Sequence, residues 1–348
     1  MKEIANALQK LIPKELDTLK RRYSILNNIQ LFQPIGRRSL AQKLNFSEKS
    51  IRSDVAYFKS EGLIQVTSIG VGIEPSGLEM LDGLKDFMRH VEGLNTIEEK
   101  VRRILDCENL LIVSGDADED EAAKIHLANV AAKMLLEHLK PNTIVALTGG
   151  STVHRVINQL KPKQLAYPEV LAVPARGSLG NHIEYHANTL VSALAKKINC
   201  KYLLLNIPDN LSQRALESVR EEPDIQQSIA FILKANIIVY GIGNVDVMVS
   251  RRSLDESIIA FLKEKEAVAE VMGYYFNKFG EIVYTSRSIG INIDEMKDLN
   301  YPIAVAGGSS KAQAILAVRK FVANGCLIID EGAAKKIIEI HEVSNSDH

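Results

Sequence analysis

The sequence predicts an α/β protein in two parts, and three features of the 348 residues carry that prediction. After residue 110, short apolar runs alternate with segments of helical apolar spacing, the pattern of a doubly wound, mostly parallel sheet. Before residue 75, two short helices precede a ribbon with glycines at its tip, the pattern of a winged helix-turn-helix. Several apolar runs also end in glycine turns. We expect a winged-helix domain at 1–75, a helical linker at 76–109 and a sheet domain at 110–343.

Composition fits an ordinary soluble protein, with 46% hydrophobic and 24% charged residues. The longest apolar runs fall far short of the roughly 20 residues that span a bilayer, and the N-terminus lacks the apolar core of a secretory signal. We therefore expect a cytoplasmic protein with no membrane partner. Cys107, Cys200 and Cys326 lie far apart without metal-ligand spacing, so we expect free thiols and no metal site.

The net charge of −1 conceals an uneven distribution along the chain. Residues 1–75 hold 12 Lys/Arg against 7 Asp/Glu, whereas the remainder has an acidic excess. A basic front end on an acidic body indicates that the N-terminal part meets a polyanion.

The N-terminal part contains the signals of a helix-turn-helix in order. Leu16, Leu19, Tyr23, Leu26 and Ile29 follow the helical period. After Pro34 and Gly36 comes the short helix RRSLAQKL, and Ser47 then caps the helix EKSIRSDVAYFKSEGLI. The stretch LIQVTSIGVGIEPSG alternates and breaks at Gly70 and Gly72, which predicts the wing.

Hydroxyl and basic side chains gather on the second helix and at the start of the first. Such residues near a helix N-terminus suit entry into the major groove, where some contact phosphates and a few read base edges. A three-helix protein–protein module is the alternative. The candidate DNA contacts are Arg37, Arg38, Ser47, Lys49, Ser50, Arg52, Ser53 and Lys59.

The expected linker, residues 76–109, has apolar residues every three or four positions, with Gly83 and Gly93 as interruptions. Such an amphipathic helix could pair two DNA-binding domains across a two-fold axis. Alternatively, its apolar stripe packs on the body.

The body contains seven strand-like runs, and segments with helical spacing lie between most of them. In parallel sheets of this kind the ligand site lies beyond the carboxyl ends of the strands. The expected strands are NLLIVSG, TIVALTG, EVLAVPA, KYLLLNI, NIIVYGIG, YPIAVAGG and GCLIID. The clearest helical segments are 122–139, 182–197, 255–265 and 310–323.

Glycine turns at three strand ends predict an anion site. Glycines allow close approach to the backbone, hydroxyls and helix N-terminal amides donate hydrogen bonds, and the helix dipole favours negative charge. Two separated loops of this kind suggest a ligand with two phosphates, or with one phosphate and a polar sugar. The candidates are Thr148, Gly149, Gly150, Ser151, Thr152, Gly241, Gly307, Gly308, Ser309, Ser310 and Lys311, with Arg176 and Arg251 as further cations.

No loop fits the nucleoside-triphosphate motif G-x-x-x-x-G-K-[ST], and G-I-G-N-V-D is only half of a dinucleotide fingerprint. We therefore expect neither a nucleoside triphosphatase nor an NAD enzyme, and no cofactor.

Several phrases resemble one family of bacterial regulators over residues 15–343. They are SLAQKLNFSEKSIRSDVAYFKSEGLI, GGSTV, ARG, YGIGN, AGGSSKAQAI and LIIDEGAAKKI. They are similar to the sorbitol-operon and deoxyribose-operon type of sugar-responsive transcriptional repressors, above all to those of glycolytic genes. The effector domain of this family is itself similar to glucosamine-6-phosphate deaminase and ribose-5-phosphate isomerase.

The resemblance implies a repressor that binds double-stranded operator DNA as a dimer or tetramer and responds to a phosphosugar, foremost fructose 1,6-bisphosphate. It also implies that Glu270 accepts hydrogen bonds from sugar hydroxyls. From the sequence alone, a solvated charge at a strand start is an equal alternative for Glu270.

An isomerase or deaminase with an accessory nucleic-acid-binding domain is the main alternative function. The deaminase motif resembles G-I-G-x-D-G-H, but here Gly241-Ile242-Gly243 precedes Asn-Val-Asp-Val-Met, so Asp246 is displaced and the histidine is missing. Acid–base catalysis needs a titratable group within reach of the proton, and His154 is the nearest candidate. We expect no catalytic residue. A body that only mediates assembly is a third possibility.

Overall fold

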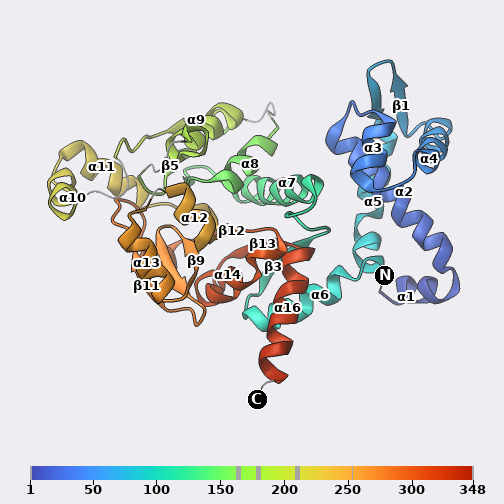
Figure 1. Cartoon of the computed structure of the whole chain (residues 1–348). Coiled ribbons are helices and arrows are strands. Elements are labelled where there is room, and N and C mark those ends of the chain that lie inside the picture. Colours follow the sequence, from blue (N-terminus) through green and yellow to red (C-terminus); the bar gives the residue numbers. More distant parts are fainter. Residues whose placement is uncertain (1, 162–165, 178–181, 208–211, 253, 347–348) are drawn as a thin grey trace. The chain divides into compact units, whose positions relative to one another are not determined.

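The computed structural model describes residues 2–161, 166–177, 182–207, 212–252 and 254–346. The chain forms two compact units, Met1–Ile97 and Glu98–His348 (Figure 1).

The N-terminal unit consists of helices around a two-stranded ribbon. Helix α6 (Leu94–Leu105) begins in this unit and ends in the next. The other elements are α1 (Lys2–Leu11), α2 (Pro13–Phe32), α3 (Arg37–Leu44), α4 (Glu48–Ser60), β1 (Ile64–Thr67), β2 (Gly70–Ile73) and α5 (Pro75–Val91).

Helices α3 and α4 form the predicted helix-turn-helix. Asn45 ends α3 in the left-handed conformation (φ 52°), and the Ser47 hydroxyl caps α4 by accepting the Ser50 amide at 3.2 Å. Strands β1 and β2 pair antiparallel as the wing, and Ile35 adds a bridge to Val71. The predicted fold of this part is confirmed.

The apolar stripe of α5 packs inside the N-terminal unit, which neither expectation for the linker included. Leu81 belongs to the core of the winged helix, while Val91 packs with Ala5 and Leu16 of α1 and α2. Gly83 lies within α5 and does not interrupt it, contrary to the expectation. The interruption at Gly93 is real, because α5 ends at Val91 and Gly93 has φ +74°.

The second unit is built on a seven-stranded parallel sheet in the order β3-β13-β12-β7-β4-β5-β6. All seven predicted runs form its strands, so the predicted α/β fold is confirmed. The strands are β3 (Asn109–Val113), β4 (Ile144–Leu147), β5 (Leu171–Pro174), β6 (Lys201–Tyr202), β7 (Ile237–Gly241), β12 (Tyr301–Val305) and β13 (Cys326–Asp330).

Helices cover both faces of this sheet. Helices α7 (Glu121–His138), α8 (Ser151–Gln159) and α9 (Ala187–Ile198) share one apolar core with the strands. Figure 1 shows α14 (Ala312–Ala317) and α16 (Glu331–Ser346) on the opposite face. The remaining helices are η1 (Ile183–Tyr185), α10 (Gln213–Arg220), α11 (Pro223–Ile232), α12 (Val245–Arg252), α13 (Glu256–Glu264), η2 (Glu295–Asp298), η3 (Ser309–Lys311) and α15 (Arg319–Val322).

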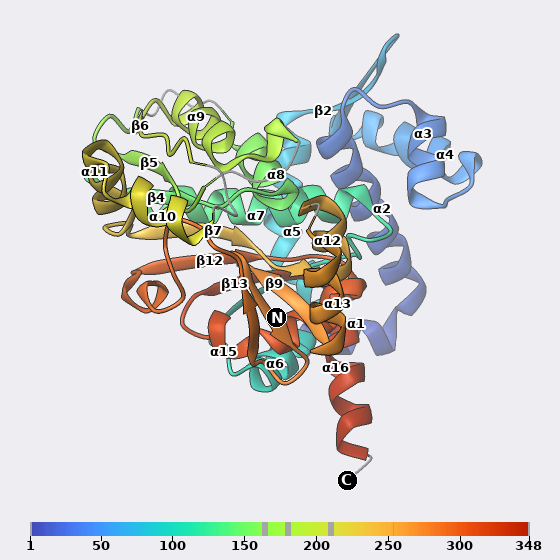
Figure 2. The ribbon, with the colours of Figure 1, turned by 60° about the vertical axis from the view of Figure 1, so that its left-hand side comes forward.

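A second sheet, which the sequence reasoning missed, is antiparallel in the order β11-β10-β9-β8. Its hairpin turns at Met272 and Gly273, both at positive φ, as a two-residue type I′ turn requires. Helices α12 and α13 lie beside β9 (Figure 2). The strands are β8 (Gly243–Asn244), β9 (Ala267–Val271), β10 (Tyr274–Asn277) and β11 (Ile282–Thr285).

No helix in the described part of the chain is both long enough and apolar enough to cross a membrane.

A buried carboxylate fastens α4 to α2 in the N-terminal unit. The side chain of Asp54 is only 2% exposed; it accepts Arg21 Nε at 2.9 Å and Arg22 Nε at 3.0 Å. The Arg22 guanidinium also lies 3.9 Å from the centre of the Tyr57 ring. Two arginines of the basic excess are therefore engaged within the unit itself.

We predict that Asp54→Asn destabilises the N-terminal unit by about 1–3 kcal/mol, because both arginines lose a charge-assisted partner. Hydrogen exchange of the α4 amides in the full-length chain measures this as faster opening. Asp17→Asn is the matched control, since Asp17 is exposed on α2. Equal exchange rates in the two variants would contradict the prediction.

Candidate functional site: a cavity at the carboxyl ends of the strands

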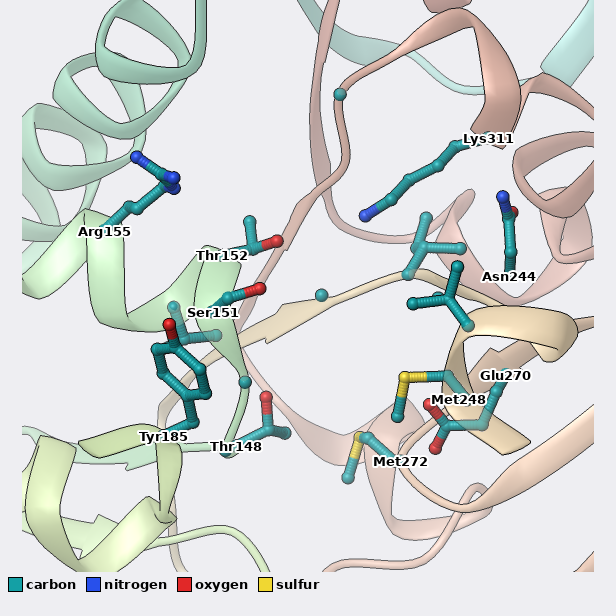
Figure 3. A pocket seen from close by; sticks show the side chains of 18 of the residues that line it. Thr148, Ser151, Thr152, Arg155, Tyr185, Asn244, Met248, Glu270, Met272 and Lys311 are labelled. Atoms are coloured by element: carbon teal, nitrogen blue, oxygen red, sulfur yellow. The ribbon is translucent and has the colours of Figure 1, made fainter. Parts of the chain in front are cut away.

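A cavity of about 500 Å³ lies at the carboxyl edge of the parallel sheet. Thr148, Ser151 and Thr152 line one side with hydroxyls, whereas Met248 and Met272 line another with apolar surface (Figure 3). A cavity of this size, with both kinds of wall, suits a small organic ligand.

Most of the predicted anion-site residues line this cavity, although the sequence separates them by more than 160 positions. Gly308 and Ser309 belong to the third glycine loop but do not line it. The backbone of Arg251 lies in α12, and its side chain lies outside the described residues. The predicted residues that do line the cavity are Thr148, Gly149, Gly150, Ser151, Thr152, Arg176, Gly241, Glu270, Gly307, Ser310 and Lys311.

The first glycine loop, Thr148–Thr152, joins β4 to α8 at the cavity. Gly150 has φ +124°, and its amide donates to the Tyr185 carbonyl at 2.8 Å. A Cβ at Gly149 would lie 2.7 Å from that same carbonyl oxygen. Glycine at 149 is therefore needed for the approach of η1, a reason that the sequence did not reveal. The first turn of α8 begins beside the cavity, and the backbone amides at a helix N-terminus point outward along the helix axis.

The third glycine loop, Ala306–Lys311, already donates its amides to carboxylates of the chain itself. Gly308 N donates to Asp330 at 2.7 Å, Ser309 N to Asp116 at 3.2 Å and Ser310 N to Asp118 at 2.8 Å. The first and third glycine loops are thus alike in sequence, but their backbone amides donate to different acceptors.

Asp330 is fully buried at the end of β13 and joins three segments. Its carboxylate accepts the amides of Ala117 at 2.6 Å, Gly308 at 2.7 Å and Ala333 at 2.9 Å. Burial raises the pKa of Asp330, and the three amides counteract that rise.

The cationic side chains that line the cavity, among them Lys311, Arg176 and Arg155, lie in different surroundings. Lys311 extends into the cavity toward the hydroxyls of the first loop (Figure 3). Arg176 is 6% exposed and donates to the Ser286 hydroxyl at 2.9 Å. Arg155 pairs with Glu121, which also holds Lys124 at 3.2 Å.

Glu270 is a buried carboxylate in the cavity wall. It lies on β9, is 4% exposed, and accepts the Gly273 amide at 2.5 Å. The alternative of a solvated charge at a strand start is therefore wrong, and the antiparallel sheet explains how a residue so placed in sequence reaches the site.

Several lining residues were not predicted, namely Asp118, His182, Tyr185, His186, Asn244, Met248 and Met272. The run DADED directly follows β3, so the strand-end rule could have found Asp118. The cluster HIEYH before α9 was a second usable signal. The candidate acid–base residues lie elsewhere: Asp246 is exposed outside the lining, and His154 packs edge-on against Tyr185 at 5.3 Å.

The described residues contain no group of three or more His, Cys, Asp or Glu side chains that could hold a metal ion.

The candidate DNA contacts lie on the surface of the N-terminal unit. Ser47, Lys49, Arg52, Ser53 and Lys59 of α4 and its cap are exposed, and Ser50 is half-buried. Arg37 and Arg38 are exposed at the start of α3, where Arg38 lies 3.7 Å from Glu48. The residues predicted for one function thus share two adjacent helices, and their contact with DNA stays a prediction.

Comparisons with known proteins cover both units. Residues 18–88 match the CggR N-terminal DNA binding domain, and residues 89–339 match a family described as a sugar-binding domain. The Central glycolytic genes regulators of Priestia megaterium and Bacillus subtilis are 38% and 37% identical to the chain, each covering 97% of it and 99% of the relative.

Among solved structures, a SorC family transcriptional regulator from Enterococcus faecalis is 31% identical, with a TM-score of 0.64. The match covers 70% of this chain and 99% of that one. The chain therefore belongs to the family of bacterial sugar-binding transcriptional regulators that includes the central glycolytic genes regulators.

Proposed function

We propose that this protein is a DNA-binding repressor of glycolytic genes that a phosphosugar, fructose 1,6-bisphosphate above all, releases or remodels on its operator. The observation that carries the proposal is the cavity in which the N-terminus of α8 and Lys311 face one another (Figure 3). Glycolytic genes are proposed as the targets because the full-length relatives are named as regulators of such genes.

In this proposal, one phosphate of the effector lies between the first loop and Lys311. The hydroxyls of Ser151 and Thr152, the first-turn amides of α8 and the helix dipole all favour an anion there. Lys311 adds a charge-assisted contact from the other side. The neighbouring carboxylate of Glu270 accepts sugar hydroxyls in this proposal. Arg176 and Arg251 are the candidates for a second phosphate.

The repressor function requires that the effector bind the DNA-competent and DNA-incompetent arrangements with different affinities. DNA must then weaken effector binding by the same factor. A thermal-shift screen of glycolytic phosphosugars, with and without promoter DNA, tests both statements. A homo-oligomer, dimer or tetramer, belongs to the proposal because the family resemblance implies it, and sedimentation with and without effector tests it.

An isomerase or deaminase is the rival function. The described carboxylates that line the cavity are Asp118 and Glu270, and Asp246 does not lie among them. The relatives are named as regulators, which favours sensing over turnover. Conversion of a sugar phosphate by the purified chain would overturn the proposal.

We predict that Lys311→Ala raises the Kd for fructose 1,6-bisphosphate at least tenfold, because a charge-assisted contact contributes roughly 1.5–3 kcal/mol. Isothermal titration calorimetry measures the change. Lys320→Ala is the matched control, since Lys320 is exposed on the neighbouring α15. Operator binding without effector should remain near the wild-type value; a parallel loss of both activities would make Lys311 structural.

We predict that Arg52→Ala weakens operator binding and lowers the slope of log K against log salt by about 1 if Arg52 contacts a phosphate, since one fewer counterion is released. Electrophoretic mobility shifts at several salt concentrations measure both quantities. Lys10→Ala, an exposed change on α1, serves as the control. Unaltered DNA binding by Arg52→Ala would remove this residue from the DNA interface, and effector binding should not change in either variant.

A further inference from the structure

Asp118 brings a carboxylate into the wall of the cavity beside Ser310 and Lys311. The residue itself is exposed, and its Oδ2 accepts the Ser310 amide at 2.8 Å. Asp116 holds this turn in place, because its Oδ1 accepts the Asp118 amide at 2.8 Å. A negative charge therefore occupies the end of the third glycine loop that faces the ligand space.

The amides of Gly308, Ser309 and Lys311 also have acceptors within the chain. Gly308 N donates to the buried Asp330, Ser309 N donates to Asp116, and Lys311 N donates to the Gly308 carbonyl at 3.0 Å. Four successive amides thus have acceptors within the chain. A phosphate at this loop would have to displace carboxylates, one of which is fully buried.

The loop is also shaped around the carboxylate of Asp118. Gly308 has φ +102°, and a Cβ there would collide with that carboxylate. The absence of a side chain at Gly308 is therefore explained by the close approach of Asp118 and does not require a ligand there. The first loop differs from the third in the acceptors of its backbone amides. Among the hydrogen bonds of the described residues, no carboxylate accepts the amides of Gly150, Thr152 or Val153.

We propose that Asp118 is a specificity-determining residue, which excludes phosphate from the third glycine loop and leaves the first loop as the backbone phosphate cradle of the site. This inference rests on the proposed sensing of a phosphosugar. It implies that a bisphosphate effector places one phosphate between the first loop and Lys311, and the other away from Gly308–Ser310.

The test is hydrogen exchange of full-length protein with and without fructose 1,6-bisphosphate, for wild type and Asp118→Asn. Asparagine keeps the size and one acceptor but removes the charge. In wild type, the ligand should leave exchange at residues 308–311 unchanged. In Asp118→Asn it should slow exchange there, and the Kd should fall by roughly three- to tenfold, the range for one screened charge at close distance. Glu119→Gln, an exposed neighbour, should behave as wild type.

Two results would overturn the inference. Faster exchange at 115–120 and slower exchange at 308–311 on binding to wild type would mean that phosphate displaces Asp118. Weaker binding by both Asp118→Asn and Asp118→Ser, with wild-type thermal unfolding, would mean that Asp118 contacts the sugar.

Failure of the proposed function is recognised separately. If wild type does not bind fructose 1,6-bisphosphate, inorganic phosphate becomes the probe. Asp118→Asn should then still bind inorganic phosphate more tightly than wild type and show slower exchange at 308–311. Equal affinity and unchanged exchange would reject the role of Asp118 itself.

Discussion

The buried carboxylate of Asp330 is the contact on which the geometry of the site depends. By accepting the amides of Ala117 and Gly308, it ties the turn after β3 to the turn after β12, while its other oxygen accepts the Ala333 amide in the first turn of α16. An ionised group at 0% exposure is costly unless hydrogen bonds compensate it. Those same bonds fix where Asp118, Ser310 and Lys311 stand at the cavity.

The parallel sheet could be predicted because its physics is local. Each strand is a short, nearly continuous apolar run, since both of its faces are covered, and each is bounded by turn residues. Strands β4, β7 and β12 therefore stand out in the sequence, and the edge rule places their loops together. The antiparallel sheet was missed because β8 has two residues and its hairpin depends on the backbone at Met272 and Gly273. Its consequence for the site is Glu270, whose burial no local pattern indicated.

The glycine loops show where sequence reasoning stops. Thr148–Thr152 and Ala306–Lys311 each contain two adjacent glycines followed by two hydroxyl residues, and both begin a helix or helical turn. Such residues indicate that amides need acceptors, but not which acceptors they find. Asp116 and Asp118 lie about 190 positions from Ser309 and Ser310, so only the fold reveals that they occupy the third loop. The steric reason for Gly149 is also visible only in the fold, because a Cβ there would collide with the Tyr185 carbonyl.

Any effect of a ligand on DNA binding must cross from one unit to the other. Helix α5 is packed within the N-terminal unit through Leu81 and Val91. In the second unit, Glu98 accepts the Ile112 amide at 3.4 Å and Arg102 donates to the Leu110 carbonyl at 3.1 Å, so α6 is fastened to β3. Within one chain, the covalent path between these anchors is residues 92–97, where Gly93 takes a left-handed conformation. Reciprocity demands that the two binding events share one set of states, so a conformational change that is transmitted along the backbone has to pass through this short segment.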